Sequence, residues 1–551
     1  MALASARHRR FRIIAFVAFC KPLLTMAAWN ALAQFFPAAA GRTWQLHGGL
    51  HLPDHKALAN LASIQPAGWP PTLVLPLSQH IGEAARPLVK PGDKVRKGQM
   101  IAKAEGWLSA PLHAPTSGRV SALEDRPVPH PSGQSAVCLV IEPDGLDQWA
   151  DLPPPLADFA KRPAAELLAR IAWAGLVGQG GATFPAAVKL APRTPVHTLI
   201  LNGAECEPYI SCDDRLMRER PGRVLAGAAI LRHILGVERC LIGIEDNKPE
   251  AIAALRQALR ESGDDATRLV VVPTLYPSGG EKQLIWLLTG QKVPSGGLPA
   301  QVGMVCQNVA TASAAADAVL DGRPMISRIV TLAGARMARP GNWEVPIGIP
   351  VAELIAQAGG DRSPAEGLIA GGPMMGFYLH SDTIPITKGL NCLLALSAQE
   401  APDPGPALAC IRCGRCAEVC PVRLLPQQLY WYARAKEFDK TREYHLADCI
   451  ECGCCAQVCP SHIPLVHYYR FAKTELAARD REKREAEQAR IRYEAHLARQ
   501  ERERQAKQRQ RPATPAPTGE AEAAAKRVAI EAALKRVADR KATERTHEPQ
   551  K

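Results

Sequence analysis

Short stretches of alternating apolar and polar residues dominate the chain from residue 43 to about residue 145. They flank glycine-containing turns, as at Pro91-Gly92-Asp93 and at Ser117-Gly118. Alternation with a period of two, bounded by turn residues, is typical of half-buried strands. This part of the chain is therefore predicted to form an all-β module.

Between residues 151 and 322, short apolar runs alternate with helix-like stretches. The expected strands are 197–202, 240–245 and 269–273, and helical patterns cover 249–260 and 281–290. Short apolar runs of this kind fit buried parallel strands, and their alternation with helices predicts a Rossmann-like α/β layer. Residues 325–370 return to short strands closed by one helix, which predicts a small α+β module.

The two ends of the chain follow neither pattern. Residues 1–42 begin with a basic stretch and an apolar run, but Lys21-Pro22 interrupts that run before it reaches the roughly 20 residues needed to span a bilayer. We expect a poorly structured or interfacial extension there. From about residue 475 the chain is rich in Ala, Lys, Arg and Glu, and the stretch at 511–520 contains several prolines. This composition predicts helical pieces joined by a disordered hinge.

The formal net charge of +13 changes this picture only at the ends. Residues 1–42 hold six Lys and Arg and no acidic residue, and residues 475–551 hold 20 Lys and Arg against 14 Asp and Glu. Each end thus carries an excess of six positive charges, which leaves +1 for everything between them. A neutral body argues against a nucleic-acid partner, and an anionic membrane surface or an acidic partner is the weaker alternative.

Nine of the 16 cysteines fall between Cys410 and Cys459, in two copies of one phrase. The copies are "CIRCGRCAEVCP" at 410–421 and "CIECGCCAQVCP" at 449–460, and both have the spacing C-x2-C-x2-C-x3-C-P. This is the bacterial ferredoxin spacing for 4Fe–4S clusters, in which the fourth cysteine of each phrase binds the other cluster. Structural zinc also uses C-x2-C pairs, and it is the weaker alternative for a complete double phrase.

Crossed ligation assigns four cysteines to each cluster. Cluster 1 takes Cys410, Cys413, Cys416 and Cys459, and cluster 2 takes Cys449, Cys452, Cys455 and Cys420. Cys454 is left over, and we interpret it as a small filling residue. The connector at 422–448 lacks glycine and has a helix-like pattern, which predicts an α-helical two-cluster domain rather than a compact β-rich one.

A glycine-rich loop, "GLVGQGGATFPAAVKL" at 175–190, precedes a helix-like stretch. Gly178, Gly180 and Gly181 would let the backbone approach a phosphate, and a helix N-terminus would offer it free N–H groups. Lys189 could reach the same phosphate or the edge of an isoalloxazine ring. The loop does not match the usual dinucleotide fingerprint, and glycine-rich turns are more often only turns, so alone it is weak support for a flavin site.

The stretch "LNGAECEPYISCDDRLM" at 201–217 directly follows an expected strand. Asn202, Glu205 and Glu207 therefore lie near the end of that strand, where α/β sheets bind their ligands. Acidic clusters in loops are usually only solvated. Beside a glycine loop, this one is a candidate polar wall for a flavin ring or a nicotinamide ribose.

These motifs, together with "IGIEDNKPEAI", "YPSGGEKQL", "GGPMMG" and the double cysteine phrase, resemble the C subunit family of the Rnf (Rsx) electron transport complex from about residue 48 to residue 473. The glycine loop and the "ECEP" turn are also similar to those of the flavin-bearing subunit of respiratory complex I. The resemblance implies FMN, two 4Fe–4S clusters and NADH as substrate. It places Gly178, Gly180, Gly181 and Lys189 at the FMN phosphate, Asn202 and Glu205 at the flavin wall, and Tyr276, Gly279, Glu281 and Asn308 elsewhere in the flavin pocket.

The chain also departs from its relatives in places. Thr183 and Ala186 stand where family members commonly have Gly and Thr, which bears on how closely NADH stacks and not on the fold. The all-β module resembles the barrel-sandwich of biotinyl and lipoyl carriers, but its hairpin "EGWLSAPLH" holds no lysine to be modified. Residues 325–370 resemble the small ligand-binding β-grasp module of the same relatives.

These expectations divide the chain into six parts. They are an N-terminal extension (1–42), a barrel-sandwich hybrid without an attachment lysine (43–150), an α/β FMN- and NADH-binding domain (151–322), a β-grasp module (323–395), an α-helical two-cluster ferredoxin domain (396–474) and a charged, partly helical tail (475–551).

The leading hypothesis is a peripheral electron-input subunit at the cytoplasmic face of the cell inner membrane. It would pass electrons from NADH through FMN and both clusters to membrane and peripheral subunits that couple the flow to ion translocation. No side chain is assigned a catalytic role, because the cofactors perform the chemistry. A soluble corrin reductase of the same architecture and a flavin-free iron–sulfur scaffold are the alternatives.

Overall fold

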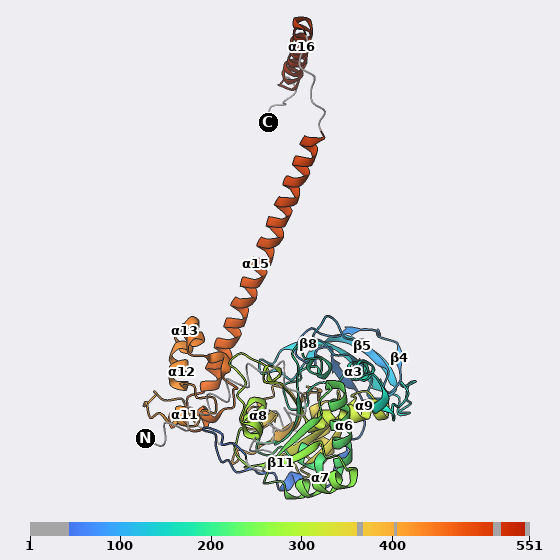
Figure 1. Cartoon of the computed structure of the whole chain (residues 1–551), viewed down its shortest axis with the longest axis vertical. Helices are drawn as coiled ribbons and strands as arrows, with labels where there is room; N and C mark the ends of the chain where they lie inside the picture. The colour runs from blue at the N-terminus through green and yellow to red at the C-terminus, as the bar shows by residue number, and fades with distance from the viewer. Residues whose placement is uncertain (1–42, 361–366, 402–404, 511–518, 546–551) are drawn as a thin grey trace, which may run out of the picture. The chain divides into compact units, whose positions relative to one another are not determined.

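The structure is a computed structural model that describes residues 43–360, 367–401, 405–510 and 519–545 of the chain. The chain divides into two compact units, Met1–Thr474 and Glu475–Lys551. The sheets of the described residues all lie in the first unit (Figure 1). The expected extension at 1–42 and most of the expected hinge at 511–520 lie outside the described residues.

The predicted all-β module is confirmed and consists of two small sheets. One joins β2 (Leu73–Pro76), β8 (Ser135–Pro143), β7 (Gly118–Pro127) and β4 (Lys94–Val95), and the other joins β3 (Arg86–Pro87), β5 (Met100–Lys103) and β6 (Leu112–His113). At the start of β7, Gly118 and Val120 are buried while Arg119 and Ser121 between and after them are exposed, as the alternating pattern requires. The hairpin between β5 and β6 presents Trp107 to solvent.

A parallel four-stranded sheet forms the core of the α/β domain, as predicted. Its order is β11 (Thr267–Val272), β10 (Arg239–Glu245), β9 (Thr198–Gly203) and β12 (Met304–Asn308). Leu199 and Leu201 of β9 pack with α6 (Pro221–Leu235) and α9 (Val309–Leu320), whereas Ile200 packs with α8 (Glu281–Thr289). Helices thus cover both faces, and the strand order is that of a doubly wound sheet. The other helices of this domain are α3 (Ala164–Trp173), α4 (Ala186–Lys189), α5 (Cys212–Glu219) and α7 (Pro249–Ser262).

The predicted α+β module is built on a six-stranded sheet in the order β1-β14-β13-β17-β15-β16. Its elements are β1 (Gln65–Pro66), β13 (Ser327–Ala333), β14 (Gly341–Pro346), α10 (Val351–Gln357), β15 (Leu368–Ala370), β16 (Phe377–Tyr378) and β17 (Cys392–Ala395). β17 lies beside β13 in the middle of the sheet. The sheet therefore needs residues well beyond the expected helix.

The ferredoxin-like domain repeats one local conformation in both cysteine phrases. α11 (Arg415–Glu418) and α14 (Cys454–Gln457) each follow a left-handed glycine, Gly414 and Gly453, both at φ 80°. The residues two positions earlier, Arg412 and Glu451, are also left-handed, at φ 58° and 57°. The two left-handed residues bend the backbone of each cysteine phrase into a tight loop, so that successive cysteines can face one point.

The connector between the phrases is helical, as predicted. It contains α12 (Pro426–Arg434) and α13 (Phe438–Glu443). Leu429 is fully buried, which anchors α12 against the domain. α15 (Leu465–Arg509) then begins in the first unit, where Tyr469 is buried.

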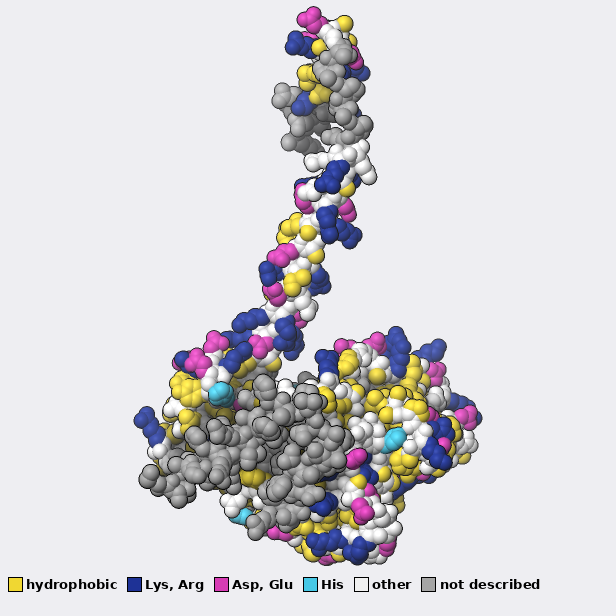
Figure 2. All heavy atoms as spheres, viewed as in Figure 1, with side chains coloured by type: hydrophobic (Ala, Val, Ile, Leu, Met, Phe, Trp, Pro, Cys, Tyr) yellow, Lys and Arg dark blue, Asp and Glu magenta, His cyan; other side chains and the backbone are white. Residues whose placement is uncertain are grey.

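The second unit holds the exposed part of α15 and α16 (Glu520–Arg545), which confirms helical pieces in the tail. Ion pairs one turn apart support α15, such as Arg490 with Glu494 and Arg499 with Glu503. Figure 2 shows basic and acidic side chains interspersed along this helix. Within the described part of the chain, no helix combines the length and the apolar character that crossing a membrane requires.

Candidate functional site

Asn202 and Asn308 face each other at the carboxyl end of the parallel sheet. They are paired residues of β9 and β12, the two strands between which the chain order reverses. Open α/β sheets bind ligands at this switch point. The Asn202 amide donates to the Gly279 carbonyl at 2.8 Å, and Asn308 Oδ1 accepts the N–H of Ala310 at 2.8 Å, which caps α9. Both asparagines therefore tie down the loops around the switch point.

The glycine loop runs past the N-terminus of α9. The N–H of Gln179 donates to Thr311 Oγ1 at 3.0 Å, and a β-carbon added at Gly180 would lie 3.6 Å from the β-carbon of Asn308. A β-carbon added at Gly181 would meet no heavy atom within 4 Å. The exposed side of the loop thus leaves open space beside a helix N-terminus, which suits a phosphate group.

Glu205 and Glu207 are both engaged by backbone N–H groups. The Glu205 carboxylate accepts the N–H groups of Asp213 at 2.6 Å and Asp214 at 3.2 Å, at the N-terminus of α5. Glu207 Oε1 accepts the N–H groups of both methionines of the "GGPMMG" stretch, at 2.7 and 2.9 Å. The two acids thus hold the wall of the site together from inside, in addition to any contact with a ligand.

The carboxyls of this wall are crowded in a poorly solvated place. Burial raises the pKa of Glu205 and of Asp213, and the positive charge of Lys56 opposes both shifts. Burial also raises the pKa of Glu207, against its two backbone hydrogen bonds. A nearby cation therefore offsets part of the cost of burying these acids.

Lys56 supplies that cation, and sequence reasoning missed it. Its ammonium donates to the carbonyls of Glu205 at 2.9 Å, Glu207 at 2.8 Å and Ile210, and the side chain is 6% exposed. The three N–H groups of the Lys56 ammonium thus match three carbonyls of one loop. Lys56 lies 149 residues before Glu205, in a segment without any motif, so no local signal could have pointed to it.

Two of the expected flavin residues pair with each other. The Lys189 ammonium forms an ion pair with the Glu281 carboxylate at the start of α8. The N–H of Gly279, two residues earlier, donates to Cys206 Sγ at 3.2 Å. The fold thus brings the glycine loop, the acidic turn and the "YPSGGEKQL" stretch together, as the sequence led us to expect.

Tyr276 is the expected flavin residue whose side chain reaches toward the ferredoxin-like domain. It is 3% exposed, and its phenol donates to the carbonyl of Cys452 at 2.7 Å. Sequence reasoning placed Tyr276 in the flavin pocket, and contact of this ring with a flavin stays a prediction.

The residues at the switch point fit an FMN group. The open side of Gly181, the start of α9 and the positive charge of Lys189 suit its phosphate, and the asparagine pair and the acidic wall suit a polar ring edge. Which of these side chains contact the flavin stays a prediction.

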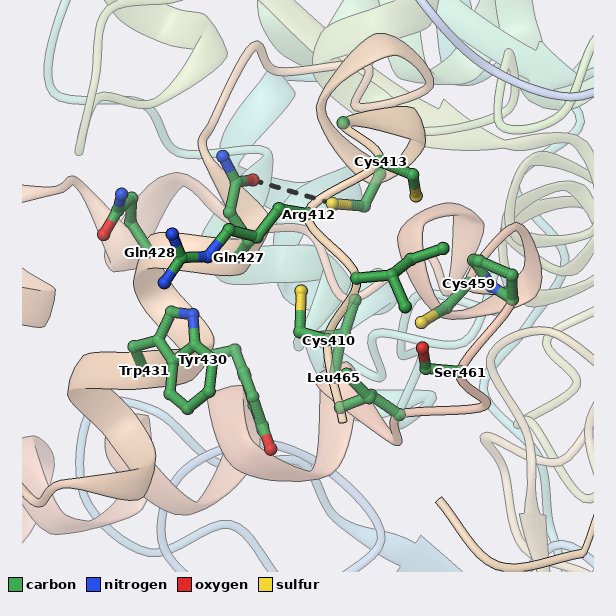
Figure 3. Close-up of a pocket in the computed structure, with 15 residues that line it drawn as sticks. Cys410, Arg412, Cys413, Gln427, Gln428, Tyr430, Trp431, Cys459, Ser461 and Leu465 are labelled. Atoms are coloured by element: carbon green, nitrogen blue, oxygen red, sulfur yellow. Dashed lines mark hydrogen bonds between the residues drawn. The ribbon is translucent and has the colours of Figure 1, made fainter. Parts of the chain in front are cut away.

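Four of the predicted ligands line one cavity of about 530 Å³ in the ferredoxin-like domain (Figure 3). They are Cys410, Cys413, Cys416 and Cys459, the set predicted for cluster 1. The sulfurs of Cys410 and Cys459 approach this space from different loops, and Trp431 and Arg412 stand at its edge. Cys413 is exposed, so the cavity opens to solvent.

The set predicted for cluster 2 lines a second, narrower cavity of about 20 Å³. Cys420, Cys449, Cys452 and Cys455 surround it, with Tyr469 and the unassigned Cys454. The linings divide the eight cysteines in the crossed manner, three from one phrase and one from the other. Ligation itself stays a prediction.

The spacing of the sulfurs bears on the zinc alternative. Four thiolates bound to one tetrahedral zinc ion at 2.3 Å would lie about 3.8 Å from one another. Among the described residues, three potential metal ligands come within 4.8 Å of one another only at Glu205, Cys212 and Asp213. In this structure no three sulfurs of either cysteine set lie as close together as a mononuclear zinc site requires.

Comparison with known families gives four consecutive matches. The RnfC barrel sandwich hybrid domain matches residues 44–146, the Nuo51 FMN-binding domain 171–317, the SLBB domain 329–378 and the 4Fe-4S dicluster domain 409–463. The architecture and the cofactor classes predicted from the sequence, FMN and iron–sulfur clusters, are thereby confirmed. The predicted domain boundaries stay predictions.

Several curated relatives are described as the C subunit of an ion-translocating oxidoreductase complex. The protein from Pseudomonas aeruginosa is 54% identical over 82% of this chain and 58% of its own length, and that from Serratia proteamaculans is 48% identical over 84% and 65%. One from Haemophilus influenzae is 45% identical over 84% of this chain and 71% of its own length. The chain thus spans less than two thirds of several of the relatives it matches.

A solved structure of an NAD+-reducing [NiFe]-hydrogenase is 18% identical, with a TM-score of 0.40 over 59% of this chain and 63% of that chain. A likeness this low carries no argument. The comparisons lend no support to the corrin reductase or to the flavin-free scaffold.

Proposed function

This chain belongs to the family of C subunits of ion-translocating oxidoreductase complexes, and from this premise we propose that it is the electron-input subunit of such a complex. The proposed donor is NADH, and the proposed acceptors are membrane and peripheral subunits at the cytoplasmic face of the inner membrane. Bound FMN would convert a hydride into single electrons, and the clusters would carry them one at a time. The chain's own part is to bind and align these groups.

In the flavin-binding domain, both backbone and side chains would contribute to holding the flavin. Gly180 and Gly181 leave room for the phosphate beside the start of α9, and Lys189 adds positive charge that Glu281 partly balances. Asn202 fixes the loop of Gly279 against the acidic turn. These contacts would hold the ring at the carboxyl end of β9 and β12.

The burial of the cysteines orders the two clusters. We call the set Cys420, Cys449, Cys452 and Cys455 the inner site and the set Cys410, Cys413, Cys416 and Cys459 the outer site. Cys452 and Cys455 are buried, and the second phrase contacts the flavin-binding domain through the hydrogen bond from Tyr276 to Cys452. Ser295 of that domain also donates to Asp448, the residue just before the phrase, at 2.5 Å. The inner site would therefore hold the cluster nearer the flavin-binding domain, and the outer site would hold the cluster nearer the surface.

The outer site opens onto a surface that suits a partner. Leu408 and Ile411 are 63% and 67% exposed beside the exposed Arg412. Apolar side chains with a cation at the mouth of a redox site favour docking of a protein with a complementary acidic rim. This surface is the proposed exit to the next subunit.

The observation that carries the proposal is the pair of thiol-lined cavities in series, one against the flavin-binding domain and one at the surface. The test is an anaerobic visible spectrum of the loaded chain before and after addition of NADH. We expect both the flavin band and the broad cluster absorbance to bleach. A cluster spectrum without flavin, unchanged by NADH, would overturn the proposal.

A further inference from the structure

A single tyrosine makes the hydrogen bond between the flavin-binding domain and a ligand of the inner site. The phenol of Tyr276 donates to the Cys452 carbonyl at 2.7 Å, and the Glu207 carboxylate also lies within hydrogen-bond reach of the same hydroxyl. The two residues lie in one buried apolar cluster with Cys454, and Met374 and Val419 pack against it. The hydrogen bond is therefore shielded from water, which strengthens it.

The backbone of Tyr276 is fixed by a third segment of the chain. The N–H of Leu50 donates to the Tyr276 carbonyl at 2.8 Å, and the N–H of Tyr276 donates to the Leu50 carbonyl at 3.0 Å. The neighbouring Gly49 donates to the Val419 carbonyl of the first cysteine phrase at 2.9 Å. The same short strap thus binds both the tyrosine and the ferredoxin-like domain, and it holds the phenol in register with Cys452.

We propose that Tyr276 is a positioning residue that sets the reduction potential of the inner cluster. The inference rests on the proposed function, because it takes the inner site to hold a 4Fe–4S cluster. Residues that hydrogen-bond a metal-binding residue orient it and tune the metal, and charges and dipoles beside a cluster shift its potential. The partly positive phenol hydrogen beside the Cys452 carbonyl offsets the negative potential of that carbonyl at the cluster, which favours the reduced cluster.

The repeat provides an internal comparison. Cys413 occupies the position in the first phrase that Cys452 occupies in the second, and the backbone turns of the two phrases are alike. Cys413 is exposed, however, while Cys452 is 7% exposed and meets the tyrosine. The effect of the hydroxyl must therefore be confined to one cluster of the two.

The test is Tyr276→Phe in the loaded full-length chain, with potentials measured by mediator titration and electron paramagnetic resonance. The inner signal is identified as the one lost in Cys452→Ala. Because mediators and dithionite set the potential, the readout does not depend on NADH and is separable from a failure of the proposed donor. Tyr432→Phe is the matched control, since the phenol of Tyr432 bonds Tyr444 in the same domain.

We expect the reduction potential of the inner cluster to fall by about 59 mV. This corresponds to about a tenfold decrease in the equilibrium constant for accepting one electron. The outer cluster should be unchanged, and the Tyr432→Phe protein should keep the potentials of the unaltered chain. Loss of inner-site iron alone, with flavin and outer cluster retained, would also support a positioning role. An unchanged inner potential, or loss of all cofactors together, would overturn the proposal.

Discussion

The γ-methyl of Thr183 occupies the space in which a β-carbon on residue 389 would have to stand. Gly389 therefore makes room for the side chain of the glycine loop. Thr183 itself is held at φ 47°, a left-handed conformation that a β-branched residue rarely adopts. The chain thus combines a left-handed backbone position, which favours glycine, with a threonine that a second glycine accommodates.

Gly389→Ala should therefore disturb the phosphate loop through Thr183. We expect a loss of roughly 1–2 kcal/mol in stability from overpacking and a several-fold loss of bound flavin, with iron content unchanged. Thr183→Gly should gain roughly 1 kcal/mol by relieving the left-handed threonine, less the entropy that glycine adds to the unfolded chain. The measurements are denaturant unfolding and flavin released on acid precipitation.

The double variant Thr183→Gly/Gly389→Ala separates the contact from any effect of alanine alone. Removing the methyl should restore most of the flavin lost in Gly389→Ala. If Thr183→Gly restored none of the flavin lost in Gly389→Ala, the two residues would act independently.

Lys56→Met should remove the support of the acidic wall. Three carbonyls would lose a charged donor in a buried place, which should cost about 3 kcal/mol of stability. The pKa of Glu205 should rise further, because the cation that opposes its burial is gone. We expect weakened flavin binding with clusters retained, whereas the exposed Lys90→Met should behave as the unaltered chain. Full flavin content in Lys56→Met would contradict a role in the site.

The local sequence pattern predicted helices and strands, and it failed where contacts between distant residues determine the structure. The runs at 197–202, 240–245 and 269–273 are β9, β10 and β11 because apolar periodicity is a local signal. β12 was missed because its five residues lie between a glycine turn and an alanine-rich helix. The strand and the helix are both apolar, so the pattern shows no boundary between them. The missing strand is half of the switch point, so the sequence pointed to Asn308 only through family resemblance.

The cysteine sets were predictable because ligand spacing is written in the sequence. The hydrogen-bond partners of Glu205 and Tyr276 could not be predicted. Glu205 caps a helix and Tyr276 reaches a carbonyl 176 residues away, and neither contact leaves a trace in composition or period. Lys56 is the clearest example, because a single lysine in an unremarkable segment completes the site.

Lys388 should make stability depend on pH above neutrality. Its ammonium is buried and donates only to the carbonyls of Pro111 at 2.8 Å and Gly175 at 2.6 Å among the described contacts, and burial lowers its pKa from 10.5 to about 7. Lys388 therefore binds more protons in the unfolded chain than in the folded one between these values, so it should contribute a rise in the free energy of unfolding from about pH 7 to 10.5, of at most roughly 1.4 kcal/mol per unit.

In Lys388→Met this contribution should be lost, so the free energy of unfolding, followed by denaturant unfolding, should have a less positive slope across that pH range. Buried thiols such as Cys206, whose pKa burial raises to about 12, lower the slope above pH 9 in both proteins alike. The neighbouring histidines do not confuse the test, because burial lowers the pKa of His80 and brings that of His113 to about 3, so both stay neutral. An equal slope in both proteins would mean that another group is responsible.

Arg412 and Glu451 give the two cluster loops opposite charges at equivalent positions. Arg412 lines the outer site and Glu451 the inner site, where Arg470 and Lys473 pair with it. Since positive charge favours the reduced cluster, Arg412→Gln should lower the reduction potential of the outer cluster, and Arg412→Glu should lower it further. Each unit of charge changed should shift this potential by about 40 mV, which is roughly 1 kcal/mol for one electron. The inner potential should stay constant. Because Arg412 is exposed, the shift should shrink at high salt, and a salt-independent shift would point to a structural change instead.

The fourth cysteine of each phrase tests the crossed arrangement of the two sites. Cys459 lines the cavity of the first phrase, and Cys420 lines that of the second. Cys459→Ala should therefore remove the outer cluster and spare the inner one, and Cys420→Ala should do the reverse. The measurements are iron content and the spectroscopic signals that remain.

Cys454→Ala is the matched control, because Cys454 is fully buried beside the inner site but is not an expected ligand. It should keep both clusters, with a small loss of stability from the missing sulfur. Loss of the inner cluster in Cys454→Ala, with Cys455→Ala unaffected, would instead make Cys454 the ligand. If Cys459→Ala lost the inner cluster, each phrase would hold its own four ligands, and the two sites would be independent rather than interlocked.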